Sequence, residues 1–264
     1  MTVREVYLEV SGGNLMLPIN GTEKRLFSRE SLKKAVGGRI VSENNKKYVQ
    51  CLKDVNIRLE SGDRLGLIGH NGAGKTSLLR ALSGIYPIGS GEIKVSGKIS
   101  TFISQGVGLS PDMNAVEYLE MQCVVQGYNK KETADFTAKV LDFIELGEFA
   151  YMPIRTYSSG MKARLMASTA IFFPCDILLI DEGIGAGDAN FSEKFDKRLK
   201  EFFAAAKIMV MASHSNDLLK KWCNKGAVMA KGEILFLGEI GEAIAYYKSL
   251  QAPFFKKNKI SVGN

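Results

Sequence analysis

One run of the chain is suited to holding phosphate groups. Residues 69–76 have the sequence Gly-His-Asn-Gly-Ala-Gly-Lys-Thr, which matches the phosphate-loop pattern G-x-x-x-x-G-K-[ST]. The glycines let the backbone curl so that its N–H groups, together with the N-terminus of a following helix, face phosphate oxygens. Lys75 can then reach the outer phosphates, and Thr76 can ligate Mg²⁺. We expect a nucleotide to bind here through Gly69, His70, Asn71, Gly72, Ala73, Gly74, Lys75, Thr76 and Ser77, with the side chain of His70, at a variable position, as a bystander.

Two later apolar runs end in polar side chains that can complete this site. The run 176–182 ends in Asp181 and Glu182, and His214 follows the run 208–213. Either feature alone is as readily explained by a solvated strand end or a surface histidine. Downstream of a phosphate loop, however, the carboxyl ends of parallel strands meet beside the phosphates. We therefore predict that Asp181 holds Mg²⁺, Glu182 is the general base for an attacking water, and His214 contacts the γ-phosphate.

The periodicity of the chain supplies the elements that would position these groups. Strands are expected at 52–59, 65–68, 177–180 and 208–212, alternating with helices at 75–83 and 193–203, which indicates a mostly parallel sheet in an α/β fold. Short strands are expected at 91–103, a hairpin at 227–237 and a last helix at 239–250. The block 112–172 has helical periodicity and is predicted to be a subdomain. The polar, basic stretch 11–47 is predicted to be an insertion or a peripheral helical hairpin, and 251–264 is predicted to be a short basic tail.

The segment Tyr157-Ser158-Ser159-Gly160-Met161 resembles the signature motif of the ABC ATPases, usually Leu-Ser-Gly-Gly-Gln. Its departures from that form, and the later run Asp181–Phe191 with its Gly-Asp-Ala-x-Phe ending, are similar to the ATPases of polysaccharide exporters for O-antigen, capsule and teichoic acid. The resemblance covers essentially residues 1–250. It implies a P-loop NTPase of ABC type, with a mostly parallel sheet core, a helical subdomain and an antiparallel β part.

That resemblance also implies roles for further residues. Ser158 would cap a helix whose N–H groups at Ser159 and Gly160 bind the γ-phosphate held by a second copy of the chain. Two copies would pack head to tail around two ATP molecules, with Asp188 in the loop that joins the two sites. Gln105 falls where the family has a loop that senses the γ-phosphate and its metal. The aromatic residue expected to stack on adenine is best matched by Tyr48.

Composition excludes several other classes of protein. The 264 residues are 45% hydrophobic and 24% charged, which is ordinary for a globular chain. There is neither an 18-residue apolar window nor a signal-peptide pattern at the N-terminus, and the four cysteines form no metal or disulfide spacing, which favours a reduced cytoplasmic setting. The segment after the last helix is too short for a carbohydrate-binding domain.

The resemblance therefore implies an ATPase subunit, peripheral on the cytoplasmic face of the bacterial inner membrane. Its partners would be a separate multispanning permease and a second copy of itself, its transported substrate an undecaprenyl-linked polysaccharide, and its cofactors ATP and Mg²⁺; no nucleic acid is expected. Another ABC transporter, a drug exporter or importer, or a soluble non-transport ABC ATPase remains the alternative. The net charge of +7 is concentrated at 22–47, with eight Lys or Arg against three Glu, and in the tail. This distribution favours a surface that faces the membrane or a partner.

Overall fold

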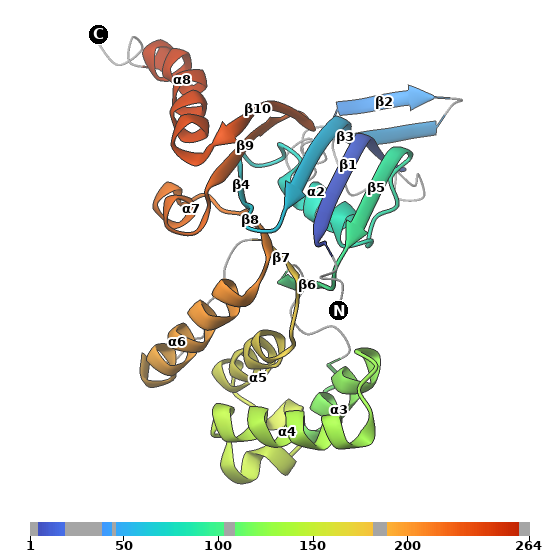
Figure 1. The fold of residues 1–264 in the computed structure, drawn as a ribbon, viewed down its shortest axis with the longest axis vertical. Coiled ribbons are helices and arrows are strands. Elements are labelled where there is room, and N and C mark those ends of the chain that lie inside the picture. Colours follow the sequence, from blue (N-terminus) through green and yellow to red (C-terminus); the bar gives the residue numbers. More distant parts are fainter. Residues whose placement is uncertain (1–4, 19–38, 44–45, 103–108, 182–188, 259–264) are drawn as a thin grey trace. The chain divides into compact units, whose positions relative to one another are not determined.

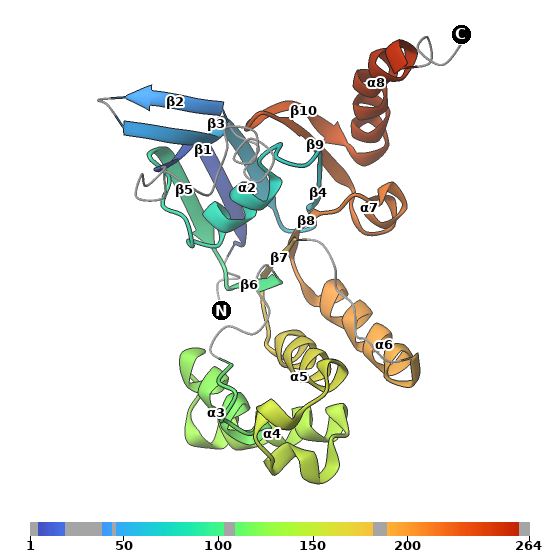
Figure 2. The same ribbon diagram turned by 180° about the vertical axis from the view of Figure 1, so that it is seen from behind.

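The structure is a computed structural model that describes residues 5–18, 39–43, 46–102, 109–181 and 189–258. It divides into two compact units, the first formed by 1–99, 176–182 and 207–264, and the second by 100–175 and 183–206. Figures 1 and 2 show the strands of the first unit and the helices of the second from opposite sides. Among the described residues, the helices fall short of the length and apolarity needed to cross a membrane.

The first unit contains an antiparallel sheet with the strand order β2-β3-β1-β5. Its strands are β1 (Tyr7–Pro18), β2 (Arg39–Glu43), β3 (Lys46–Glu60) and β5 (Ser90–Ser96). The long strands β1 and β3 alternate between buried and exposed side chains, as expected where one face of a sheet packs on a core. This sheet is the antiparallel part that the family resemblance implies.

A second sheet has the strand order β10-β9-β4-β8-β7-β6. It contains β4 (Arg64–Ile68), β6 (Ile99–Phe102), β7 (Ile177–Asp181), β8 (Ile208–Ala212), β9 (Lys225–Ala230) and β10 (Glu233–Glu239). Strand β4 pairs in parallel with β8 and β9, and β7 pairs in parallel with β8. Four of the five residues of β4 and all five of β8 are buried, because both faces of the sheet are covered. The predicted parallel core is confirmed.

Helices cover this second sheet within the first unit. Helix α2 (Lys75–Leu82) packs against β7, β8 and β3, so it lies between the two sheets. Helix α8 (Ile240–Asn258) packs against β4, β9 and β10 and contacts α7 (Asn216–Trp222), as Figure 1 shows. The parallel strands and α2 thereby fix the edge of the sheet at which the predicted site residues are found.

Two predicted boundaries were wrong. Residues 11–18 belong to β1, where Leu15 is only 1% exposed, and 39–43 form β2, so both ends of the supposed insertion 11–47 are strand. The pairing of β1 with β3 shifts register around Gly13, and this irregularity carries the strand past the glycines that suggested its end. Residues 19–38 and 44–45 of the predicted insertion lie outside the described residues. The last helix continues to Asn258 through Pro253, so most of the predicted tail is helical.

The second unit is helical and extends the predicted subdomain 112–172. Its helices are α3 (Ala115–Val125), α4 (Lys130–Ile144), α5 (Ser159–Phe172) and α6 (Ala189–Ala205), with the short 3-10 helices η1 (Gly147–Tyr151) and η2 (Ile154–Thr156). Asn114 and Glu117 form a capping box at α3, and Asn129 and Glu132 form one at α4. Helix α6, which follows β7 in the sequence, packs against α5 and was not expected in this unit.

Candidate nucleotide-binding site

The phosphate loop connects β4 to α2, which is the strand-to-helix context that its sequence requires. Gly72 and Gly74 have φ angles of 79° and 110°, in a region that L side chains rarely adopt. A Cβ atom on Gly74 would also lie 2.8 Å from the carbonyl oxygen of Cys51. Glycine is therefore required at this position for both conformation and space.

Lys75 is held against the loop by its own backbone. Its side chain is 7% exposed, and its Nζ donates hydrogen bonds to the carbonyl oxygens of Gly69 at 2.7 Å and His70 at 3.4 Å. These bonds satisfy a buried ammonium group that would otherwise be costly. The charge is thus fixed at the loop, where an incoming phosphate would meet it.

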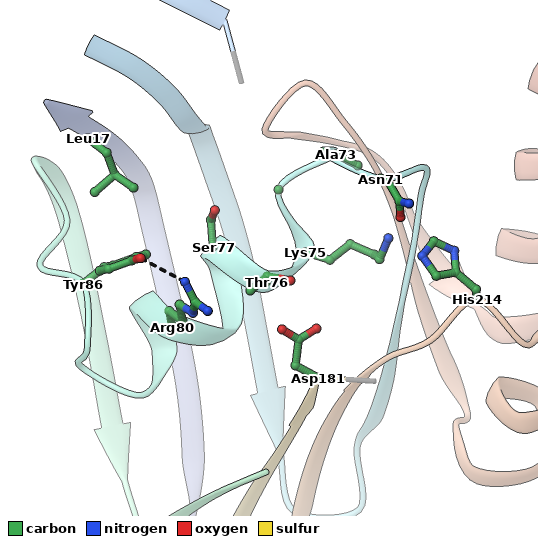
Figure 3. Close-up of a pocket in the computed structure, with 12 residues that line it drawn as sticks. Leu17, Asn71, Ala73, Lys75, Thr76, Ser77, Arg80, Tyr86, Asp181 and His214 are labelled. Atoms are coloured by element: carbon green, nitrogen blue, oxygen red, sulfur yellow. Dashed lines mark hydrogen bonds between the residues drawn. The ribbon is translucent and has the colours of Figure 1, made fainter. Parts of the chain in front are cut away.

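The loop opens into a cavity of about 420 Å³ that brings together most of the predicted site. In Figure 3 the carboxylate of Asp181 lies below Thr76, and the ring of His214 lies beside the end of Lys75. This arrangement follows from the register of the sheet, since Asp181 is paired with Ala212 and Leu67 with Ala212 at neighbouring strand ends. The residues that line the cavity are Leu17, Asn71, Gly72, Ala73, Gly74, Lys75, Thr76, Ser77, Arg80, Tyr86, Asp181 and His214.

The donor set at one end of the cavity fits a hard cation. Thr76 offers a hydroxyl oxygen and Asp181 a carboxylate, which are the ligand types that Mg²⁺ binds together with phosphate oxygens and water. Both residues come from rigid elements, the first turn of α2 and the end of β7. The two side chains therefore agree with the predicted metal-binding role.

Three residues of the cavity were missed by sequence reasoning: Leu17, Arg80 and Tyr86. The guanidinium of Arg80 donates a hydrogen bond of 2.9 Å to the Tyr86 hydroxyl. Arg80 lies one helical turn after Ser77, so helical spacing could have found it. Leu17 could not be found, because its strand had been assigned to an insertion.

Tyr48, predicted to stack on the base, is not among the residues that line the cavity. It lies in β3, opposite Pro18 of β1, and is half-buried. Leu17 is the neighbouring residue of β1, and Figure 3 shows its side chain at the end of the cavity remote from Lys75 and His214. Among the described residues that line the cavity, Leu17 and Tyr86 therefore provide the large side chains against which an adenine ring could pack.

The predicted signature forms a helix N-terminus in the second unit. The hydroxyl oxygen of Ser158, the N-cap of α5, accepts a hydrogen bond of 3.1 Å from the amide of Met161. Ser158 and Ser159 are exposed, and the first turn of α5 contains no acidic residue. The partial positive charge of this N-terminus is thus open to an anion.

The remaining predicted site residues, Gln105, Glu182 and Asp188, lie outside the described residues. Their roles as sensor, general base and joining acid stay predictions. Asp181, the residue immediately before Glu182, is described and lines the cavity.

Comparisons with known proteins identify the family of the chain. The family model described as "ABC transporter" matches residues 52–185. The O-antigen export system ATP-binding protein RfbE of Yersinia enterocolitica is 40% identical over 79% of this chain and 87% of its own length. The teichoic acids export ATP-binding protein TagH of Staphylococcus epidermidis is 34% identical, over 83% of each chain.

Solved structures share the fold. The ATP-binding cassette MJ0796, in a dimeric post-hydrolysis state bound to ADP and Pi, superposes with a TM-score of 0.63 at 18% identity, covering 88% of this chain and 98% of that one. Along this chain the phosphate loop comes first, the capped signature helix α5 second and the acidic end of β7 third. The chain belongs to the ABC transporter family.

Proposed function

We propose that this chain is the ATP-hydrolysing subunit of a transporter that exports a lipid-linked polysaccharide from the cytoplasmic face of a bacterial membrane. The observation that carries the proposal is that the phosphate loop, Asp181 and His214 line the same cavity. The class of cargo rests on the relatives named for O-antigen and teichoic acid export. The membrane-spanning path would come from a separate subunit.

Different residues of the chain would bind the phosphates, hold the metal and accept the proton during ATP hydrolysis. The amides of the phosphate loop and Lys75 bind the β- and γ-phosphates, and His214 contacts the γ-phosphate. Thr76 and Asp181 would hold Mg²⁺, which, when bound, offsets negative charge on the phosphate oxygens. Glu182 takes a proton from the attacking water. The N-terminus of α5 presents its N–H groups to the γ-phosphate on a second copy, so that ATP holds two copies together.

The adenine ring of ATP would occupy the end of the cavity at Leu17. Replacing Leu17 by Ala removes apolar contact worth about 1 kcal/mol, so the dissociation constant for ATP is expected to rise about fivefold. The matched substitution Tyr48→Ala, on the neighbouring strand, should change it less than twofold. Equilibrium binding of a fluorescent ATP analogue measures both. A larger effect at Tyr48 than at Leu17 would restore the original assignment of the base site to Tyr48.

The membrane partner is tested by co-purification. When membranes are solubilised in detergent and the tagged chain is captured, we expect one multispanning protein in about equal amount. Recovery of ribosomes or DNA without a membrane protein would contradict transport.

The co-purification experiment can be repeated with a variant of the basic segment between β1 and β3. Neutralising Lys33, Lys34 and Arg39 together should lower recovery of the membrane protein by about tenfold or more, since each basic residue near an anionic surface contributes up to about 1 kcal/mol. ATP binding should be unchanged, because the loop amides, Lys75 and Asp181 that would hold the nucleotide are left intact. Loss of ATP binding with full recovery of the partner would refute this assignment.

A further inference from the structure

Tyr157, the first residue of the signature, is joined by its hydroxyl to another segment of the second unit. The side chain is buried, and its hydroxyl donates a hydrogen bond of 2.6 Å to the carbonyl oxygen of Phe149 in η1. Burial raises the pKa of Tyr157 above its ordinary value, so at physiological pH the group stays a neutral O–H that can donate. One phenol oxygen therefore connects η1 to the residue that precedes the N-cap of α5.

The backbone around Tyr157 reinforces this junction. The amide of Ile154 donates to the carbonyl oxygen of Met113 at 2.7 Å, and the amide of Arg155 to that of Pro111 at 2.9 Å. The side chains of Arg155 and Asp112 also form an ion pair at the surface. The segment that precedes the signature is thus bound to the segment that precedes α3 by two backbone hydrogen bonds and one ion pair.

The cap of α5 begins one residue after this junction. Ser158, which follows Tyr157 directly, is the N-cap of α5. Because hydrogen bonds to an anion depend steeply on direction, the N–H groups of Ser159 and Gly160 are useful only if the N-terminus of α5 is held at a fixed angle. The leucine that is usual at the first position of the ABC signature has no hydroxyl and cannot make the hydrogen bond to Phe149.

We propose that the Tyr157 hydroxyl is a positioning group that orients the N-terminus of α5 toward the γ-phosphate on the second copy. The inference rests on the proposed function of that N-terminus. Tyr157 itself touches no phosphate; it acts through Ser158 and the first-turn amides. Removing only the oxygen should therefore weaken the ATP-dependent pairing of two copies and leave ATP binding to the phosphate loop unaltered.

The test compares Tyr157→Phe with Tyr151→Phe in full chains that also carry Glu182→Gln, so that bound ATP persists. Tyr151 lies in η1 with its side chain 71% exposed, so its substitution makes the same chemical change at a site outside the junction. Analytical ultracentrifugation with ATP and Mg²⁺ gives the dimer dissociation constant, and a fluorescent ATP analogue gives nucleotide affinity. Tyr157→Phe is expected to raise the dimer constant about tenfold, the equivalent of one well-made hydrogen bond, with unchanged nucleotide affinity. Tyr151→Phe should leave both values unchanged.

The outcomes separate the two proposals. If Glu182→Gln alone forms no ATP-dependent dimer, the proposed function fails; if it dimerises and Tyr157→Phe dimerises equally well, the positioning role alone is refuted. Hydrogen exchange should also accelerate at the first-turn amides of α5, Met161 included, and not at its last turn; uniform acceleration would indicate a merely structural role. Should Tyr157→Phe fail to fold, Tyr157→Leu, which introduces the residue usual at this position of the signature, should raise the dimer constant at least as much, and no change in that variant would overturn the inference.

Discussion

Replacing Lys75 by Ala is expected to lower kcat/KM for ATP hydrolysis by at least a hundredfold. The ammonium is buried and fixed against the loop carbonyls of Gly69 and His70, so its charge is already in place when phosphate binds. A preorganised charged donor of this kind contributes about 3–4 kcal/mol to binding and to the transition state. Alanine leaves the loop backbone in place but removes that charge.

The matched control for this substitution is Lys53→Ala. Lys53 lies in β3 with its side chain about half exposed and forms an ion pair with Glu233 rather than lining the cavity. We expect its loss to leave kcat/KM within twofold, since exposed ion pairs contribute little. Phosphate release in a coupled assay measures both variants, and near-ultraviolet circular dichroism checks the fold. Equal loss of activity in the two variants would mean that the cavity is not the site of hydrolysis.

Replacing Glu182 by Gln should lower kcat by about a hundred- to ten-thousandfold, because the amide cannot take a proton from the attacking water. Affinity for ATP should persist, since the phosphate loop, Lys75 and Asp181 are unchanged. The chain should therefore accumulate as ATP-bound dimers, visible by size-exclusion chromatography.

Glu193→Gln, on the exposed face of α6, makes the same chemical change away from the site and should retain full turnover. Unchanged turnover in the Glu182→Gln chain would show that Glu182 is not the general base. Loss of ATP affinity in that chain would instead place Glu182 among the binding residues.

The catalytic end of the site could be predicted from sequence because its residues are tied to short-range patterns. A glycine-rich loop needs a strand before it and a helix after it, and apolar strands that end in Asp181 or precede His214 reach the same edge of a parallel sheet. These constraints depend on local spacing and on one rule of sheet topology.

The end of the cavity proposed to bind adenine could not be predicted from sequence, because it depends on the pairing of strands that are distant in the chain. Leu17 reaches the cavity only because β1 continues past Gly13, where its pairing with β3 shifts register. The polar and glycine-containing composition of this stretch indicated an insertion or a peripheral helical hairpin, and tertiary pairing overrode that indication. Tyr48 was chosen for its aromatic ring, but the strand that carries it does not bring it to the cavity.

The role proposed for the Tyr157 hydroxyl could not be predicted from sequence either. The sequence marks Tyr157 as a departure from the common signature, but its hydrogen-bond partner, Phe149, lies 8 positions earlier in a different element, η1. Only the tertiary structure reveals which carbonyl oxygen the hydroxyl contacts. Side-chain roles that depend on tertiary packing therefore emerged from the structure rather than from the motif.

The central claim, that ATP hydrolysis by this chain drives polysaccharide export, is tested most directly by measuring undecaprenyl-linked polysaccharide in cells whose only copy of the chain carries Glu182→Gln. The account predicts that lipid-linked polysaccharide accumulates inside the cell and that surface polysaccharide falls, relative to cells with Glu193→Gln. Normal surface polysaccharide without internal accumulation, in cells whose purified variant lacks ATP turnover, would contradict it.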